Sequence, residues 1–307
     1  METIVMALGG NALLNKGETP TFETQLKNAT RTAKHLLGTL ANRDKRIVIT
    51  HGNGPQVGNE YLRSEYASRE VPRLPLYIMN AETQALIGSI LELAFMKELE
   101  RIGINRKVTT VVTHVVVNGR DSAFRKPTKP VGPFYTKNQL KRELANERFS
   151  YAKFGAKYRR IVPSPKPISI VELNEIKTLM HEGYIVLCCG GGGVPVSKEG
   201  SSLKGSNAVI DKDATTRLLA NSIGATEMVI LTNVDKLYLD YPKMKQPVSR
   251  MAASELERKI NRFEAGTMRP KLEACVEFVR KSRKIAKIGD LFDADRVVHG
   301  KAGTIIY

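Results

Sequence analysis

The sequence predicts an α/β fold, a three-layer α/β/α sandwich around a mostly parallel sheet, and two observations support this prediction. Short apolar runs rich in β-branched residues recur along the chain, as in strands buried on both faces. Between these runs lie longer stretches with apolar residues at helical spacing. Strands that are separated by helices form βαβ units with right-handed crossovers, so the helices should cover both faces of the sheet.

The predicted elements follow from these two patterns, taken in chain order. The predicted strands are 3–8, 46–50, 107–117, 184–189 and 227–232. The predicted helices are 22–42, 80–102, 171–182, 214–223, 254–262 and 271–283.

A polar, basic and proline-bearing segment, 118–167, interrupts this alternation and is expected to leave the sheet. It contains "KPTKPVGPFY" at 126–135, where three prolines exclude a central strand or the middle of a helix. The prolines stiffen the backbone around Lys129. We expect Phe134 and Tyr135 to pack this segment against the body of the protein.

Composition limits the class of protein. The chain has 307 residues, 42% of them hydrophobic, which is typical of a globular protein. No apolar run approaches the roughly 20 residues of a membrane span, and the first residues are too short and too poor in basic side chains for a signal peptide. We therefore expect a soluble cytoplasmic protein. The three cysteines, Cys188, Cys189 and Cys275, form no metal-binding or disulfide pattern.

The formal charge of +17 is high and suits anionic ligands, nucleic acid or a membrane surface. Basic residues are dense in 137–160 and in 280–287, and we interpret the second stretch as a helix end. No recognised nucleic-acid motif accompanies them, so a solvated surface is the favoured interpretation and nucleic-acid binding is an unlikely main function.

Glycine-rich turns follow three predicted strands. The carboxyl ends of parallel strands lie at one edge of the sheet, where open α/β folds bind ligands. Glycine lets backbone N–H groups approach an anion closely. Each turn alone is also compatible with a simple tight connection, but three together favour a ligand site. The sequence contains neither a Walker A motif nor GxGxxG. The candidate residues are Gly9, Gly10, Asn11, Gly52, Asn53, Gly54, Gly191 and Gly192.

Two lysines are candidates for contacts with a phosphoryl group. Lys212 lies between Asp211 and Asp213, and a carboxylate beside a lysine keeps it charged and directs it. The alternative is an aspartate that caps the helix starting near Ala214, beside a solvated lysine. Lys271 follows a proline at a helix start. The alternative interpretation of Lys271 is an ordinary lysine in the first turn of that helix.

Taken in order, "ALGGNAL", "THGNGPQVG", "PTKPVGPFY", "GGGGVPV", "VIDKD", "LTNVD", "AGTMRPK" and the closing "HGKAGTIIY" resemble the carbamate kinases of the amino acid kinase superfamily nearly end to end. The glycine turns are shared across that superfamily. "PTKPVGPFY" is the specific element, because it resembles the protruding subdomain of carbamate kinases.

The resemblance implies a single domain over 1–307 with an open eight-stranded sheet. An N-terminal substrate lobe would cover about 1–207, the protruding subdomain about 118–167, and a C-terminal nucleotide lobe about 208–307. It also implies a homodimer and reversible direct transfer between ATP plus carbamate and ADP plus carbamoyl phosphate, with Mg²⁺. In many members the reaction forms ATP at the end of arginine breakdown.

The resemblance also implies roles for particular residues, none of them a protein ligand of a metal. Lys129 resembles the subdomain lysine that reaches the transferred group, and Asp213 the carboxylate that organises the lysines. Lys212 and Lys271 resemble the lysines on the phosphates, and the glycine turns resemble the cradle of the substrate. The expected nucleotide-binding residues are Lys212, Thr232, Asn233, Asp235, Met268 and Lys271.

A charge argument supports Lys129. Related kinases commonly carry a catalytic lysine just after the first strand, but Asn11 stands there and Lys16 is expected to be too distant. Phosphoryl transfer depends on positioning and charge stabilisation. A cation absent from one place must therefore come from another, and the stiff 126–135 segment offers one.

Three positions depart from the family pattern. Arg269 stands where family members usually have glycine, Asn233 where aspartate is common, and the segment 74–90 lacks an aspartate and a glycine expected near Tyr77 and Ala85. These departures leave open a paralogue that phosphorylates another small acid.

Overall fold

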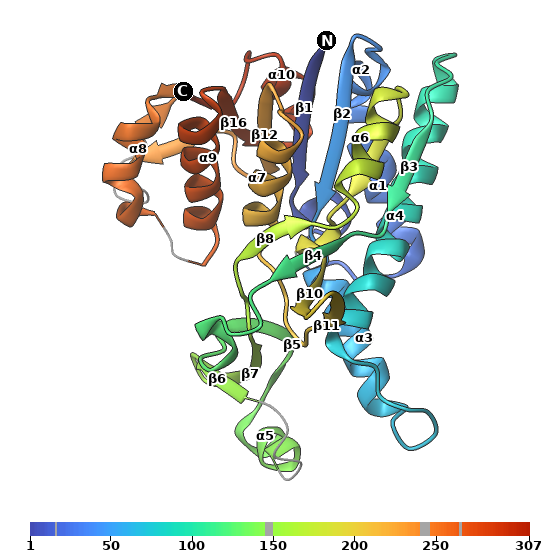
Figure 1. Cartoon of the computed structure of the whole chain (residues 1–307), viewed down its shortest axis with the longest axis vertical. Helices are drawn as coiled ribbons and strands as arrows, with labels where there is room; N and C mark the ends of the chain where they lie inside the picture. Colours follow the sequence, from blue (N-terminus) through green and yellow to red (C-terminus); the bar gives the residue numbers. More distant parts are fainter. Residues whose placement is uncertain (16, 145–149, 240–245, 264–265) are drawn as a thin grey trace.

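The structure is a computed structural model that describes residues 1–15, 17–144, 150–239, 246–263 and 266–307 (Figure 1). Lys16 and part of the basic 137–160 segment therefore lie outside the described residues.

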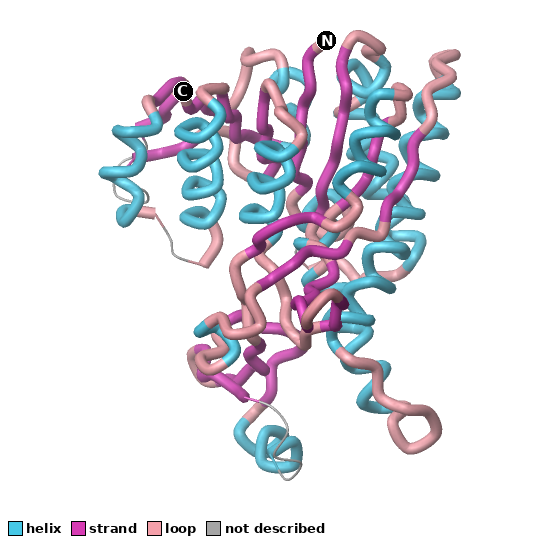
Figure 2. The backbone as a smooth tube through the Cα atoms, in the orientation of Figure 1, coloured by secondary structure: helices cyan, strands magenta, loops and turns pink. Residues whose placement is uncertain are grey.

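The predicted large sheet is present, with eight strands, and Figure 2 shows it between layers of helices. Neighbouring strands within this sheet run parallel, except for β16 and β17, which pair antiparallel. The fold class and the mostly parallel eight-stranded sheet are confirmed. The strand order is β15 (Arg250–Met251), β17 (Thr304–Ile306), β16 (Ile285–Asp290), β12 (Glu227–Thr232), β1 (Glu2–Leu8), β2 (Lys45–His51), β9 (Ile185–Cys188) and β3 (Val108–Val111).

The two sides of the sheet carry separate hydrophobic cores because strand side chains alternate between faces. In β1, Val5 and Ala7 belong to one core, and Ile4, Met6 and Leu8 belong to the other. The first core is covered by α6 (Leu173–His181), α7 (Lys212–Ser222), α8 (Ala253–Lys259) and α9 (Met268–Ser282). The second is covered by α1 (Phe22–His35), α2 (Leu37–Ala41), α4 (Leu76–Arg101) and α10 (Ala294–Val298).

The single strand predicted over 107–117 is wrong. The chain forms β3 and then β4 (His114–Val117), which belong to different sheets. The break lies at Thr113, whose backbone N–H donates to Gln84 Oε1 at 3.1 Å and whose carbonyl accepts from Gln84 Nε2 at 3.2 Å. A side chain from α4 thus takes the Thr113 N–H, while the Thr113 carbonyl also accepts from the backbone N–H of Val194 in β10 (Val194–Glu199) at 2.8 Å.

Some helix limits also differ from prediction. The helix predicted over 22–42 is divided at Leu36 into α1 and α2. The 280–287 stretch is not only a helix end: α9 ends at Ser282, Arg283 takes a left-handed conformation, and β16 follows. Helix α3 (Gly54–Tyr66) was not predicted at all.

Among the described residues, no helix is both long and apolar enough to cross a membrane. Short 3₁₀ turns are η1 (Gly10–Ala12), η2 (Ser122–Phe124), η3 (Gly190–Gly192), η4 (Ile260–Arg262) and η5 (Leu291–Asp293).

Smaller sheets extend from the carboxyl side of the large one (Figure 1). A four-stranded sheet contains β11 (Ser202–Gly205), β10 (Val194–Glu199), β4 and β8 (Pro167–Ile170). A three-stranded sheet, called the small sheet below, contains β5 (Lys129–Tyr135), β7 (Lys157–Val162) and β6 (Ser150–Phe154), with α5 (Lys137–Leu144) beside it. Strands β13 (Leu237–Leu239) and β14 (Gln246–Val248) pair antiparallel with each other. The proline-rich 126–135 segment thus contributes an edge strand, as its three prolines require.

The small sheet contacts the body of the protein through α3. Gly58 on α3 meets the backbone of Gly132 so closely that a Cβ at Gly58 would lie 3.2 Å from the Gly132 Cα. Gly132 has φ +77°, which favours glycine. Val131 and Val162 pack into a small core with residues of α3 and α4. The prediction that Phe134 packs against the body is wrong, because its ring meets Phe154 of the same sheet.

Candidate active site

A cavity of about 310 Å³ lies at the carboxyl ends of the central strands, where the turn after β2, the start of α7 and β5 meet. We call it the lysine cavity. Of the predicted residues, it brings together Gly52, Asn53, Gly54, Lys129, Gly191, Lys212, Asp213 and Lys271. Lys129 comes from the small sheet and Lys271 from α9, so residues far apart in sequence converge here.

A second cavity, of about 620 Å³, adjoins the first and shares Thr267 and Lys271 with it. We call it the strand-end cavity because it begins where β12 ends. It is lined by the predicted nucleotide-binding residues Thr232, Asn233, Asp235, Met268 and Lys271. Apolar side chains such as Val234 and Phe263 line it as well, so one part could accept a flat apolar group.

Asp211 connects helix α7 to Lys129. It is the N-cap of α7, and its Oδ1 accepts from the backbone N–H of Asp213 at 3.0 Å and of Ala214 at 3.3 Å. Its Oδ2 accepts from Lys129 Nζ at 2.8 Å. The capping interpretation of this aspartate is therefore right. The ammonium of Lys129 is thus held by a carboxylate of another segment.

Asp213 holds the other two lysines. Its Oδ1 lies 2.8 Å from Lys212 Nζ, and its Oδ2 accepts from Lys271 Nζ at 2.8 Å. Asp213 is only 4% exposed. One buried carboxylate between two ammonium groups leaves positive charge unbalanced. The five charged side chains of the cavity, three lysines and two aspartates, carry a net charge of +1.

The protonation states agree with this arrangement. Burial alone would raise the pKa of the Asp213 carboxyl, but the charges of Lys212 and Lys271 outweigh it and hold the pKa below its usual range. Burial lowers the pKa of Lys212, and Asp213 opposes that shift. Within the described part of the chain, Lys212 Nζ is buried and makes this ion pair but no hydrogen bond of good geometry. Its N–H groups are therefore suited to an arriving anion.

The glycine turns are supported from α4. Asn53 Nδ2 donates to Asn80 Oδ1 at 3.1 Å and to Thr83 Oγ1 at 3.0 Å. The Asn53 amide lies against Gly191, where any Cβ would overlap it, and Gly191 has φ +63°. Only glycine fits at this position without displacing Asn53.

Three of the described predicted residues are not brought into either cavity. Gly192 is buried, and its carbonyl accepts from Thr215 Oγ1 at 3.0 Å, which is a structural role. Gly9 and Gly10 lie in the turn after β1 but line neither cavity. The Asn11 side chain is outside the described part of the structure, and a role for this turn stays a prediction.

Arg269 does not point to solvent, nor does it contact the aspartates of the lysine cavity. Its Nη2 donates to the carbonyls of Asn261 at 3.2 Å and Phe263 at 3.0 Å. Phe263 lines the strand-end cavity. Arg269 therefore holds one wall of that cavity.

Two contributors to the site were not on the predicted list. Asp211 was recognised only as a neighbour of Lys212, although its side chain positions Lys129. Thr267, which lies where the cavities join, gave no signal beyond its place in "AGTMRPK". The pairing of Asp211 with a residue 82 positions away has no pattern in sequence.

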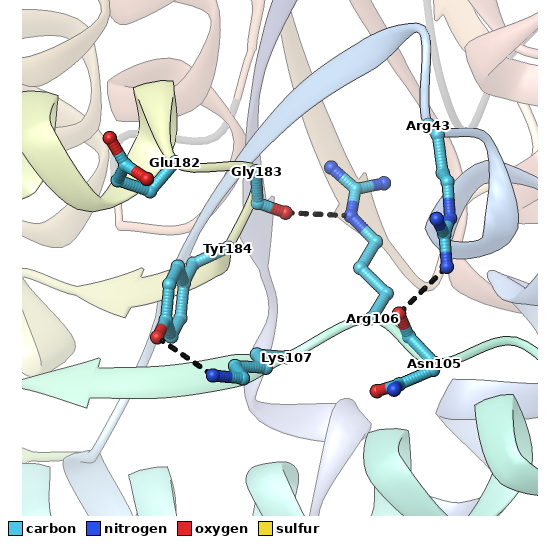
Figure 3. Close-up of a pocket in the computed structure, with 7 residues that line it drawn as sticks. All are labelled: Arg43, Asn105, Arg106, Lys107, Glu182, Gly183 and Tyr184. Atoms are coloured by element: carbon cyan, nitrogen blue, oxygen red, sulfur yellow. Dashed lines mark hydrogen bonds between the residues drawn. The ribbon is translucent and has the colours of Figure 1, made fainter.

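A cavity of about 400 Å³ at the opposite, amino-terminal edge of the sheet is also basic (Figure 3). Arg106 is its buried member, and its guanidinium donates to the carbonyls of Leu40, Asn42, Lys45 and Gly183. Burial lowers the pKa of Arg106 to about 10, so it stays charged at neutral pH. Because most of its donors are used by backbone carbonyls, this cavity has a structural explanation.

Comparison with known proteins decides the family. A family model described as the amino acid kinase family matches residues 2–290. A carbamate kinase from Staphylococcus haemolyticus (strain JCSC1435) is 42% identical over 316 residues, which cover 100% of this chain and 99% of the relative.

The chain belongs to the amino acid kinase family.

Within this family it groups with the carbamate kinases. A carbamate kinase from Thermococcus kodakarensis (strain ATCC BAA-918 / JCM 12380 / KOD1) is 39% identical, with 99% of this chain and 98% of the relative covered. The structure of a carbamate kinase from Giardia lamblia bound to AMP-PNP has a TM-score of 0.92 and 36% identity, covering 99% and 98% of the two chains. The resemblance noted in the sequence is confirmed.

Proposed function

We propose that this protein catalyses reversible phosphoryl transfer between ATP plus carbamate and ADP plus carbamoyl phosphate. The observation that carries the proposal is the convergence of Lys129, Lys212 and Lys271 in one cavity, each held at 2.8 Å by Asp211 or Asp213. Such a cavity fits a phosphoryl group whose negative charge is spread over several oxygens.

The nucleotide would occupy the strand-end cavity. Its phosphates would extend toward Lys271, which borders both cavities, and its base would lie along the apolar wall at Phe263. A Giardia lamblia relative was solved with AMP-PNP, which supports the binding of a nucleotide by this chain. Asn233 lines the cavity but carries no charge, so recognition there would rest on hydrogen bonds.

The transfer itself would be direct and in line. A carbamate oxygen attacks the γ-phosphorus, the bond from that phosphorus to the bridging oxygen of ADP breaks, and no protein nucleophile is required. The chain's own contribution is positioning and charge: Lys212 and Lys271 bind from the α7 and α9 side, and Lys129 approaches from the small sheet. The turn at Gly52–Gly54 would hold the acceptor.

Mg²⁺ is implied by the reaction, and the residues present fit a metal that arrives with the nucleotide. Among the described residues, no group of three or more His, Cys, Asp and Glu side chains could hold a metal ion. Mg²⁺ commonly binds substrate phosphates with only one or two carboxylates, and Asp211 and Asp213 are the carboxylates at this cavity. When bound, the ion would neutralise part of the phosphate charge.

The organisation into lobes and the homodimer belong to the same proposal. The lysine cavity lies where the proposed substrate lobe (1–207), its subdomain (118–167) and the nucleotide lobe (208–307) meet. Exposed apolar side chains on one helix, Leu86, Leu93 and Met96 of α4, support a subunit contact. A cytoplasmic location and a place at the end of arginine breakdown stay predictions.

The divergent 74–90 segment gives no support for another small acid as the acceptor. Asn80 and Thr83 of α4 still hold Asn53, whereas Ala85 is exposed and Tyr77 packs against Gly205, outside both cavities. The altered positions therefore do not line the substrate site.

A substrate panel tests the proposal. ATP formation from ADP should be fastest with carbamoyl phosphate and at least tenfold slower with acetyl phosphate, followed by a coupled hexokinase assay. Equal rates with the two phosphates would reject carbamate specificity and favour the paralogue.

A further inference from the structure

The positive charge of this protein is concentrated in one segment. Residues 118–167 contain thirteen lysines and arginines against three acidic residues, a net charge of +10 out of the chain's +17. Phosphoryl transfer, as proposed above, uses one of these cations, Lys129. The remaining charge calls for a separate explanation.

The register of the small sheet assigns its side chains to two faces. Residues directly opposite each other in an antiparallel pair lie on the same face. Arg160 and Val162 of β7 face the body: Arg160 lies over the Tyr61 ring at 4.5 Å, and Val162 packs into the core with α3. The alternate residues, Lys157 and Arg159, therefore point outward.

The outward face carries two exposed aromatic rings. Phe134 pairs with Arg159 across the β5–β7 ladder, and Phe154 pairs with Lys157 across the β6–β7 ladder. Phe134 is 51% exposed and Phe154 is 41% exposed. Their centroids lie 6.3 Å apart in an edge-to-face arrangement. Adjacent exposed aromatic rings form an apolar surface that a partner could cover.

Arg159 joins the aromatic and cationic features. Its Cζ lies 5.2 Å from the centroid of the Phe134 ring, and its Nε donates to the Gly132 carbonyl at 2.7 Å. The guanidinium is thereby fixed over one face of the Phe134 ring, which leaves the other face and the Phe154 ring for stacking. The outward face thus presents aromatic rings, an ordered arginine and the exposed Lys157, within a segment of charge +10.

We propose that this outward face of the small sheet binds single-stranded nucleic acid without sequence preference. Bases stack on exposed aromatic rings because every base has a π-face, and cations alongside contact the phosphates. A duplex fits less well, because its bases are already stacked on one another. A free nucleotide would offer one base and few phosphates, so it would not use the width of the sheet.

This surface is separate from the lysine cavity. Lys129 pairs in register with Val162, whose side chain faces the body, whereas Phe134 pairs with Arg159 on the outward face. Nucleic acid could therefore bind while Lys129 remains on its own side of the sheet. The inference does not rest on the proposed phosphoryl transfer.

The test uses the full-length protein and a labelled oligouridylate of about 15 nucleotides, a length within the known site sizes, followed by fluorescence anisotropy. We expect binding that weakens as salt rises but persists at about 150 mM salt. The double variant Phe134→Leu, Phe154→Leu keeps apolar bulk and removes the rings, and should bind about tenfold more weakly. The matched control is Tyr66→Leu, an exposed aromatic on α3, which should bind like the wild type.

Retained phosphoryl transfer in the double variant would show that it is folded. If that variant lost activity, the single variant Lys157→Glu on the same face should show the weakening instead. The inference is overturned if the wild type does not bind at about 150 mM salt. It is also overturned if removal of both rings leaves the affinity unchanged, or if a duplex of equal length binds as tightly as the single strand.

Discussion

We expect the replacement of Lys129 by alanine to separate catalysis from stability in this protein. Lys129 is the one cation in the described lysine cavity that comes from the small sheet, and it has no part in packing the main cores. We expect Lys129→Ala to lower turnover by about 10²-fold or more, in the range found when a preorganised charge or donor at a transition state is removed. ADP affinity should change little, because Lys271 and the strand-end cavity remain.

The structure sets the expected stability change. The Lys129 and Asp211 side chains are 42% and 28% exposed, and ion pairs that reach solvent to this extent contribute less than about 1 kcal/mol. Asp211 keeps its helix-capping role after the substitution, since that role uses Oδ1. The folded state should therefore lose at most about 1 kcal/mol while the transition state loses about 3 kcal/mol or more.

Three measurements test the predicted effects of Lys129→Ala: turnover in the direction of ATP formation, ADP affinity by calorimetry, and the melting temperature. Lys204→Ala is the matched control, because Lys204 makes a 2.7 Å ion pair with Glu199 outside both cavities. It should lose no activity. Wild-type turnover in Lys129→Ala would remove Lys129 from the mechanism, and a loss of activity that follows the melting temperature would show a structural role instead.

Two further predictions concern Arg269 and His51. Arg269→Gly removes the contacts to the carbonyls of Asn261 and Phe263, so the KM for ADP should rise about tenfold with little change in kcat; an unchanged KM in steady-state assays would contradict a wall-holding role. Burial lowers the pKa of His51 from its usual 6.5 to about 4. Below pH 6.5 the unfolded state therefore binds a proton at His51 that the folded state does not bind until the pH approaches 4. Stability should fall by up to about 3 kcal/mol between pH 6.5 and 4. In chemical denaturation, His51→Gln should show a shallower fall over this window, and an identical pH dependence in the variant would refute the assignment.

Local patterns predicted most of the large sheet and failed where tertiary contacts replaced them. The runs at 3–8, 46–50 and 227–232 are apolar on both faces, and such segments become central parallel strands in almost any packing. The 107–117 run is also rich in β-branched residues, but the Gln84 side chain bonds to both backbone groups of Thr113, and the run divides there into two strands of different sheets. Helix α3 was missed because it starts within a glycine turn, where composition indicates a loop.

The candidate site was likewise only partly predictable from the sequence. Lys212, Asp213 and Lys271 could be named because carboxylate and lysine are neighbours in "VIDKD" and because "AGTMRPK" has a recognisable pattern. The partner of Lys129 could not be named, since nothing in sequence places β5 against the start of α7. The structural role of Gly192 also depends on a contact with Thr215 from another element.

By itself, the order of residues determined the central parallel strands, most of the helices that cover them, and which residue types can stabilise a phosphoryl group, because these depend on neighbours within a few positions. Only the tertiary structure decided which carboxylate directs each lysine, that Arg269 supports a wall, and that Phe134 faces solvent. Those outcomes depend on which distant segments pack together, and packing is settled by the whole core at once.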